Sequence, residues 1–323
     1  MLIDDRVYGI NTIQKQVLIE LINSKPLQRL KGINQAGASF YTVKGKDENR
    51  FEHSVGVMLL LKYLGASTEE QVAGLVHDIS HMAFSHVIDY VVGNLDETYH
   101  EEFFEKIILN SEIPEIIKRH GFRLDRLLDE SNFGLLERNI PDLCADRIDY
   151  TLRAMARGKQ IPNDKIKQYL ENLVVVDNEI FFNEINIGRN FAEDYLNTGE
   201  NNWSHPVEVA TFQLMANALK IAFEKGILSE IDMFGDDNSV YNKLLNSKNN
   251  EILKILNRLN YDLHAVEDTN NFDFYSKNKI RYVDPKIVSC NFKRVSDIYP
   301  EFKKRLDEHN NKIRKGFFLR IIN

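Results

Sequence analysis

The segment "VHDISHMAFSHVIDY", residues 76–90, holds three histidines and two aspartates, whereas the whole chain has nine histidines. It continues an apolar stretch, "VAGLV" (residues 72–76), which predicts burial. A buried histidine or aspartate is costly unless it is paired or bound to a metal. The segment therefore predicts either an unusually hydrated helix or a group of side chains that hold a ligand.

On a helix, His77 and His81 would share one face, and Asp78 would lie about 100° round from His77. Imidazole and carboxylate groups are common ligands of divalent ions. Two ligands do not complete a site, so others must come from elsewhere, and His53 and Asp146 are the candidates. Taken singly, His53 and Asp146 are more simply interpreted as structural residues. The adjacent His77–Asp78 pair has no such ordinary explanation, because it follows an apolar run.

The composition is that of a soluble globular protein: 323 residues, 43% hydrophobic, 28% charged and a net charge of −7. This charge disfavours a large nucleic-acid surface but leaves phosphate-bearing small molecules open. Two cysteines, Cys144 and Cys290, imply no disulfide framework and suit a reducing compartment. No secretory signal is recognisable, and the apolar runs are shorter than the roughly 20 residues of a membrane span. We expect a cytoplasmic protein that does not enter a membrane.

Most of the chain has helical periodicity. Helices are predicted over residues 12–24, 54–65, 67–84, 140–158 and 205–226. Residues 173–182 predict a hairpin with its turn at Asp177–Asn178, residues 39–43 and 279–290 predict short strands, and residues 235–251 a loop or helix junction. The expected fold class is mainly α with small β-hairpin additions. We expect a helical core over residues 1–225, with the metal site from residues 50–150 and the hairpin near 172–183, and a C-terminal helical subdomain with short strands over 226–323.

The ordered set His53, His77–Asp78 and Asp146 resembles the H…HD…D signature of the HD-domain metal-dependent phosphohydrolases. The flanking segments "NRFEHSVGV", "AGLVHDISHMAFSH" and "ADRIDYTLRA" are similar to those of the deoxynucleotide triphosphohydrolase branch. "PLQRLKGINQAG" and "IRYVDPKIV" extend the resemblance through nearly the whole chain. The resemblance implies an HD-domain helical core. The four-part signature is specific, whereas an isolated HD dipeptide would carry little information.

The resemblance also implies roles for particular residues. One divalent or transition metal ion would be bound by the four signature residues, with Fe, Mn, Zn, Ni or Co as candidates and Mg as a further one. The positions that line the phosphate path and transfer protons are His81, His86, Asp89 and His100, with His100 expected to pair with Asp89. Positions that contact phosphates are Arg50 and Arg147, and positions near the sugar and base are Gln35 and Tyr150. The ordinary alternatives are an exposed ion pair for Asp89, a core contact for Tyr150 and a loop position for Gln35.

The sequence also departs from that branch. Ala154 follows Arg153 where an acidic residue would reach the sugar, so that contact is missing. No arginine occurs between Arg189 and the end of the helix predicted at 205–226. Asn23 and Lys31 stand where nucleotide-activated members tend to have Asp and Arg, so no guanine-nucleotide effector is expected. Further cations for phosphate would be Lys44, Lys46 or Lys159.

The function predicted from these residues is metal-dependent hydrolysis of deoxynucleoside triphosphates to nucleoside and triphosphate. One alternative is a nucleotidase or phosphodiesterase that acts on a smaller or modified nucleotide. Another is a weakly active, nucleotide-binding regulatory protein. The resemblance implies a nucleotide substrate and a homo-oligomer, dimer or higher, while nucleic acid is disfavoured as a partner.

Overall fold

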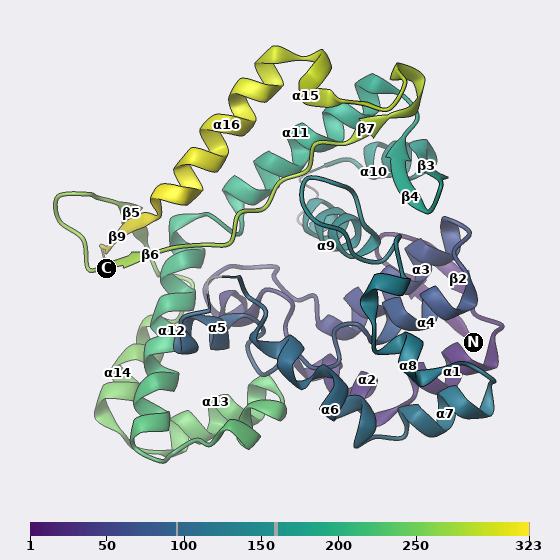
Figure 1. Cartoon of the computed structure of the whole chain (residues 1–323). Helices are drawn as coiled ribbons and strands as arrows, with labels where there is room; N and C mark the ends of the chain where they lie inside the picture. The colour runs from purple at the N-terminus through teal and green to yellow at the C-terminus, as the bar shows by residue number, and fades with distance from the viewer. Residues whose placement is uncertain (95, 158–160, 323) are drawn as a thin grey trace.

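The computed structural model describes residues 1–94, 96–157 and 161–322, and most of them are helical (Figure 1). The α-helices are α1 (Gln16–Ile22), α2 (Lys25–Arg29), α3 (Arg50–Tyr63), α4 (Thr68–Val76), α5 (Val87–Val92), α6 (Phe104–Leu109), α7 (Ile113–Arg119), α8 (Leu124–Leu127), α9 (Ala145–Ala156), α10 (Asn163–Asn172), α11 (Ile185–Asn201), α12 (Pro206–Glu224), α13 (Asp237–Asn246), α14 (Asn250–Arg258), α15 (Val295–Ile298) and α16 (Pro300–Lys315). Short 3₁₀ helices are η1 (Leu30–Gly32), η2 (Gly37–Tyr41), η3 (Tyr99–Phe103), η4 (Glu130–Asn132), η6 (Glu230–Phe234) and η7 (Val288–Cys290). The mainly α fold class is confirmed.

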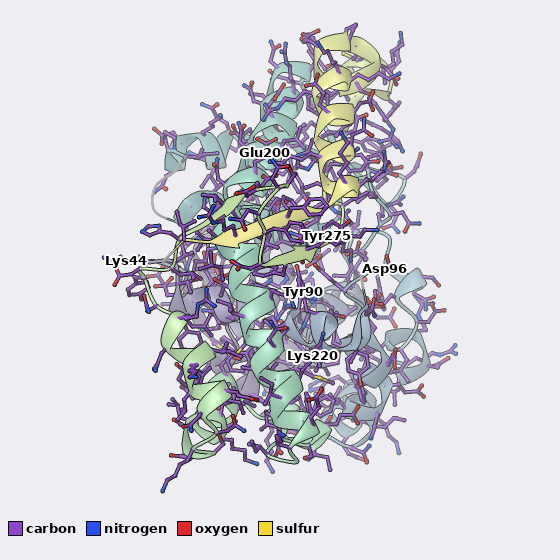
Figure 2. All side chains as sticks on the ribbon, turned by 90° about the vertical axis from the view of Figure 1, so that its left-hand side faces the viewer. Lys44, Tyr90, Asp96, Glu200, Lys220 and Tyr275 are labelled. Atoms are coloured by element: carbon purple, nitrogen blue, oxygen red, sulfur yellow. The ribbon has the colours of Figure 1, made fainter. Side chains whose placement is uncertain are left out.

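The strands form three small sheets at the edge of the helical body. Their bounds are β1 (Leu2–Asp5), β2 (Gly9–Thr12), β3 (Leu173–Val176), β4 (Glu179–Phe182), β5 (Ala265–Glu267), β6 (Phe274–Ser276), β7 (Lys286–Ile287), β8 (Lys293–Arg294) and β9 (Phe317–Ile321). β1 pairs with β2, the second sheet has the order β3-β4-β7-β8, and the third has the order β5-β9-β6. Figure 2 shows the third sheet lying across α12, with Tyr275 labelled on it, and the small core there joins Val209 to Phe317 and Leu319.

Two apolar cores meet beside residues 76–90, the segment that carries three histidines and two aspartates. The larger one includes Leu60 of α3 and Leu75 of α4, and the second is built around α5, α12 and α14 and includes Leu219. The segment between α4 and α5 spans both, because Ile79 is buried in the first core and Met82 in the second. Hydrophobic burial on both sides therefore fixes the chain that carries His77, His81 and His86.

Several predicted elements are confirmed. α3 ends just before Gly65, and α12 ends just before Gly226, two glycines with positive φ. The hairpin of β3 and β4 turns through Asp177 and Asn178, both also at positive φ, as a two-residue turn that matches strand twist requires. The first helix, α1, is shorter than predicted because residues 9–12 form β2.

Three other predicted elements are wrong or only partly right. Residues 39–43, predicted as a strand, lie in and after η2, where Thr42 Oγ1 bonds Thr211 Oγ1 of α12 at 2.8 Å. Residues 235–251, predicted as a loop or helix junction, contain α13, because Asp236 caps the helix and apolar side chains bury one of its faces. In the segment 279–290 only Lys286–Ile287 forms a strand.

The helix predicted over residues 67–84 begins as expected, with Ser67 accepting a hydrogen bond from Glu70 N, but it ends at Val76. The backbone beyond Val76 is satisfied by distant partners instead of by its own helix. The Arg29 guanidinium donates to the carbonyls of Ile79 (2.7 Å) and His81 (2.8 Å), and Asp237 Oδ1 accepts from Phe84 N (2.6 Å). Phe84 and Ser85 both have positive φ, a strained conformation for residues other than glycine. His77 and His81 therefore do not share a helix face.

The helix predicted over residues 140–158 begins only at Ala145. The residues before it belong to the neighbouring sheet, since Leu143 bridges to Ile180 and the carbonyl of Pro141 accepts from Asp284 N at 3.0 Å. Pro141 is therefore not in the first turn of α9. The predicted stop at Gly158 lies outside the described residues, and so does Lys159.

The chain after β6 runs back across the body to β7 (Figure 1). It carries Lys279 and Arg281 past the site described below. Val283, Ile287 and Phe302 then join the larger core. The division into two units at residue 225 stays a prediction. Within the described part of the chain, every helix is too short or too polar to cross a bilayer.

Candidate metal centre and active site

The four predicted metal ligands converge on one point from three elements. His53 comes from α3, His77 and Asp78 follow α4, and Asp146 lies in the first turn of α9. Asp146 Oδ1 is 2.9 Å from His53 Nε2 and 3.4 Å from His77 Nε2. Asp78 closes the group, with Oδ1 at 3.4 Å from His77 Nε2 and Oδ2 at 3.7 Å from His53 Nε2. Two imidazoles and two carboxylates therefore face one another within the reach of a single ion.

His77 is held in the orientation that a metal ligand needs. Its Nδ1 lies 2.8 Å from the Gly74 carbonyl, which accepts a hydrogen bond from it and so directs Nε2 toward the centre. Nε2 is buried and has no hydrogen-bond partner among the residues that the structure describes. An unpartnered buried nitrogen that faces three other donors suits a bound cation.

His53 is oriented from behind by a buried ionic group. Its Nδ1 lies 2.7 Å from Asp149 Oδ2, and Asp149 also accepts from Arg153 Nε at 2.7 Å. Arg153 continues to Asp5 at 2.7 Å. Gly56 makes room for this group, since a Cβ there would overlap both Asp149 and Arg153. A carboxylate behind a ligand histidine fixes the ring and raises its basicity.

The charges of the centre shift its pKa values strongly. Burial acts to lower the pKa of His77, but Asp78 and Asp146 together raise it to about 10. Burial acts to raise the pKa of Asp78, but Arg50 and the histidines hold it well below its usual range. His53 and His77 hold the pKa of Asp146 low against the same effect of burial, so both carboxylates are ionised at neutral pH, as metal binding requires.

A second cluster, formed by His81, His86, His100 and Asp89, adjoins the centre. His81 and His100 stack with ring centroids 3.6 Å apart, and His81 Nε2 lies 3.2 Å from Asp78 Oδ1. His86 Nδ1 lies 3.2 Å from Asp89 Oδ2. Asp89 thus pairs with His86 and with Tyr99 N, and the expected partner His100 packs on His81 instead.

Burial keeps the three histidines of this second cluster neutral. It lowers the pKa of His86 to about 3 and that of His100 to about 3. For His81, burial and the nearby Arg50 hold the pKa well below its usual range. A bound phosphate would oppose these shifts, because negative charge favours the imidazolium form.

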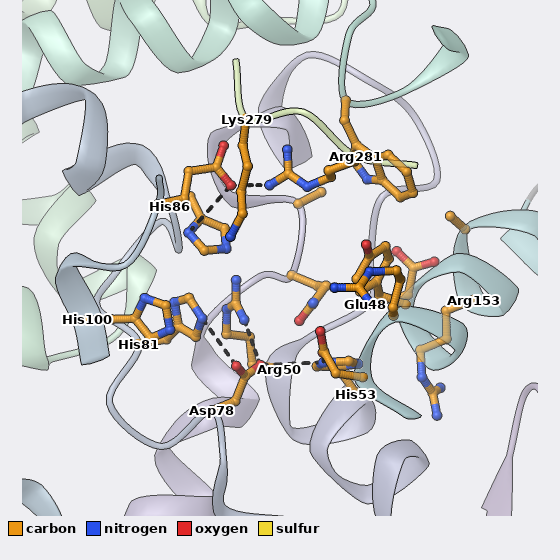
Figure 3. Close-up of a pocket in the computed structure, with 18 of the residues that line it drawn as sticks. Glu48, Arg50, His53, Asp78, His81, His86, His100, Arg153, Lys279 and Arg281 are labelled. Carbon is orange, nitrogen blue, oxygen red and sulfur yellow. Dashed lines mark hydrogen bonds and ion pairs between the residues drawn. The ribbon is translucent and has the colours of Figure 1, made fainter. Parts of the chain in front are cut away.

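The four candidate substrate-binding residues lie around one pocket of about 320 Å³, which the metal centre and the second cluster also line (Figure 3). Arg50 donates to Asp78 at 2.6 Å and to Ser85 at 2.7 Å, and it faces the pocket between the two clusters. The Arg147 guanidinium donates hydrogen bonds to Glu137, to Cys144 Sγ and to the carbonyls of residues 138 and 142. Tyr150 bonds Tyr195 at 2.6 Å and meets Trp203 edge-on. Gln35 lines the same pocket, and its Oε1 is buried without a hydrogen-bond partner in the described part of the chain.

The residues that sequence reasoning missed come from distant parts of the chain. Lys279 and Arg281 reach the pocket from the segment between β6 and β7, and Arg281 pairs with Glu97 (Figure 3). Among the described residues, Lys279 forms no ion pair, so its charge is open to a ligand. Asp149 lies three residues after Asp146 on α9 and contacts His53 from behind. No local spacing pointed to Glu97 or to the basic pair 279/281.

The donor set fits a divalent metal ion. His53, His77, Asp78 and Asp146, which line the pocket, would hold it. When bound, such an ion would polarise a phosphate oxygen and acidify a water. Arg50, Lys279 and the second cluster would orient the phosphate and move protons beside it.

Comparison with known proteins agrees with this site. The HD domain family matches residues 50–154, which span all four candidate ligands. The chain is 40% identical to uncharacterized protein YdhJ of Bacillus subtilis, covering 100% of this chain and 99% of that protein. It is 30% identical to metal-dependent phosphohydrolase cns2 of Cordyceps militaris, covering 89% of this chain and 85% of that protein.

More distant similarities support the same assignment. Deoxynucleoside triphosphate triphosphohydrolase SAMHD1 of Gallus gallus is 31% identical over 38% of this chain, which spans 24% of that protein. The crystal structure of a hypothetical protein from Aquifex aeolicus shares the fold, with a TM-score of 0.70, 21% identity and coverage of 93% of this chain and 92% of that one. The chain belongs to the HD-domain metal-dependent phosphohydrolases and is a hydrolase of the branch that resembles deoxynucleotide triphosphohydrolases.

Proposed function

We propose that this protein hydrolyses deoxynucleoside triphosphates to nucleoside and triphosphate. The observation that supports the proposal is the shared pocket, where two histidines and two carboxylates suited to a metal adjoin a second group of three histidines. A pure binding protein has no need for the second group. The partial similarity to SAMHD1 supports a deoxynucleotide substrate.

The phosphate end of the substrate would lie between the two clusters. Arg50 projects there and supplies charge-assisted hydrogen bonds, and Lys279 supplies a further cation where the chain lacks the expected arginines. Burial of the phosphate near these groups strengthens each contact, because the local dielectric is low.

His86 is the proposed proton donor for the leaving 5′ oxygen. Its hydrogen bond to Asp89 fixes the ring and favours the imidazolium when a phosphate is bound. His81 and His100 form the wall of the phosphate path beside it. Tyr150 and Trp203 offer an aromatic surface for the base at the other side.

The experiment is an incubation of purified protein with each dNTP, NTP and nucleoside monophosphate, alone and in mixtures, with Mn²⁺ or Co²⁺, followed by chromatography of the products. Deoxynucleoside plus intact triphosphate is expected. His77→Ala with Asp78→Ala should abolish it, whereas His120→Ala, which removes a histidine paired with Glu20 outside the pocket, should not.

Other products would redirect the proposal. Nucleoside plus orthophosphate from monophosphates would favour a nucleotidase. No turnover of any nucleotide, with a metal still bound, would refute hydrolysis of these substrates and favour a nucleotide-binding regulatory protein. We further propose that the protein is cytoplasmic and homo-oligomeric, and size-exclusion chromatography with light scattering tests the oligomeric state.

A further inference from the structure

Glu48 ends in a buried oxygen that nothing in the described part of the protein satisfies. Its side chain is 4% exposed, and Oε2 accepts from Arg157 Nη1 at 3.1 Å. Oε1 is buried without a hydrogen-bond partner, and Glu48 lines the pocket. An unsatisfied buried acceptor is costly, and such a group needs an explanation in a native structure. A ligand that donates a hydrogen bond at this point would supply one.

The backbone fixes Glu48 beside Gln35. Gln35 N donates to the Glu48 carbonyl at 2.9 Å, and the neighbouring residues Asn34 and Asn49 form a β-bridge. The Oε1 atom of Gln35 is also buried without a partner. Gln35 and Glu48 therefore both bring an open acceptor oxygen to the same pocket, and the Gln35 amide can also donate.

The cations near Glu48 are already engaged, unlike Lys279 at the phosphate side. Arg157 binds Glu48, and the buried Lys46 pairs with Glu208. Burial acts to raise the pKa of Glu48, and the Arg157 guanidinium opposes the rise. This end of the pocket offers an open acceptor and no open cation among the described residues that line it.

The two ends of the pocket thus differ in the charge and hydrogen-bonding groups that they offer to a ligand. Figure 3 shows Glu48 on the side opposite His81, His86 and His100, with Arg50 and Asp78 between them. One end suits phosphate, and the other suits a neutral group that carries hydroxyl hydrogens. A nucleotide has this arrangement, with phosphates on the 5′ carbon and a free hydroxyl across the sugar ring.

We propose that Glu48 reads the sugar, by accepting a hydrogen bond on Oε1 from the 3′-hydroxyl of a mononucleotide. The inference rests on the proposed function for the identity of the ligand. It makes Glu48 a specificity-determining residue. Glu48 would supply the acidic contact to the sugar that is missing at Ala154. It also disfavours a substrate with a phosphate on that hydroxyl, because the phosphate would meet a carboxylate.

The test compares 2′-deoxynucleoside triphosphates with their 2′,3′-dideoxy counterparts in the metal-loaded protein. Wild-type kcat/KM should favour the 3′-hydroxyl substrate by about 10- to 100-fold, as for one hydrogen bond to a charged group. Glu48→Ala should bring the ratio close to one. Glu48→Gln, which keeps the shape and one acceptor, should retain part of the discrimination. Glu193→Ala, which removes a carboxylate paired with Arg305 outside the pocket, should leave the ratio unchanged.

Calorimetric binding of the same two nucleotides to the metal-free protein separates this inference from the proposed function. Discrimination in binding that Glu48→Ala removes, without turnover, would support sugar reading while hydrolysis fails. Turnover without discrimination, or an equal loss for both nucleotides in Glu48→Ala and Glu48→Gln, would overturn the role of Glu48 while hydrolysis stands. Absence of binding to either nucleotide, together with absence of turnover in the metal-loaded protein, would overturn both.

Discussion

Asp149→Asn should weaken metal binding although Asp149 does not face the metal position. Asp149 is fully buried and accepts three hydrogen bonds, from His53 Nδ1 (2.7 Å), Arg153 Nε (2.7 Å) and Tyr8 Oη (2.8 Å). Asparagine keeps the size but removes the charge that orients His53 and raises its basicity. Loss of such a partner typically lowers metal affinity by about 10- to 100-fold, or about 1.4–2.7 kcal/mol.

The same change should also destabilise the fold. Arg153 would lose one of its two buried carboxylate partners and keep Asp5. Removing one partner of a buried ion pair costs about 3–5 kcal/mol of stability. Because Arg153 keeps its pair with Asp5, we expect a loss near the lower of these values. The two effects must therefore be measured separately.

Metal affinity is measured by competition with a chromophoric chelator for Mn²⁺ or Zn²⁺, at a temperature where the variant is folded. The free energy of unfolding is measured on the metal-free protein by denaturant titration. Tyr8→Phe is the matched control, because it removes one hydrogen bond to Asp149 and leaves both the Asp149 charge and His53 in place. It should cost about 1.5–3 kcal/mol of stability, as for a hydrogen bond to a charged group, and leave metal affinity unchanged. A folded Asp149→Asn protein with wild-type metal affinity would refute the orienting role.

Three other predictions concern the same pocket. Exhaustive chelation should abolish hydrolysis, and one added divalent ion per chain should restore it. Hydrolysis by protein whose measured metal content is below about one tenth of an ion per chain would contradict this. Burial lowers the pKa of His86 from 6.5 to about 3, so the unfolded chain alone binds that proton and stability falls as pH drops from 6.5 toward 3. His86→Gln should reduce this slope by at most about 1.4 kcal/mol per pH unit in metal-free protein, and an unchanged slope would argue for a solvated His86. Lys279→Met should raise KM for a triphosphate about three- to tenfold with little change in kcat. Lys220→Met on α12 should leave both KM and kcat unchanged.

The sequence predicted what depends on residue type and short spacing. The apolar periodicities identified α3, α4 and α12, with Gly65 and Gly226 just beyond two of their ends. The Asp177–Asn178 pair identified the hairpin because both residues tolerate positive φ. These signals are local, so they were legible without any knowledge of the fold.

Local signals failed where distant groups replaced local hydrogen bonds. The pattern of residues 67–84 favours a continuous helix, but Arg29 and Asp237 satisfy the backbone beyond Val76. Asp237 itself lies in a segment predicted as a loop or helix junction. Polar composition concealed the two buried apolar positions, Val240 and Leu244, that hold α13 in place.

By itself, the sequence determined the chemical identity of the centre: which histidines and aspartates are present, in what order, and hence the family. The tertiary structure decided how they are used. It ended the α4 helix just before His77 and placed Asp149 behind His53. It also brought Glu48, Lys279 and Arg281 to one pocket from positions far apart in the chain. The physical reason is that ligand type is a property of single residues, whereas orientation, burial and charge balance depend on contacts between segments that no spacing in the sequence records.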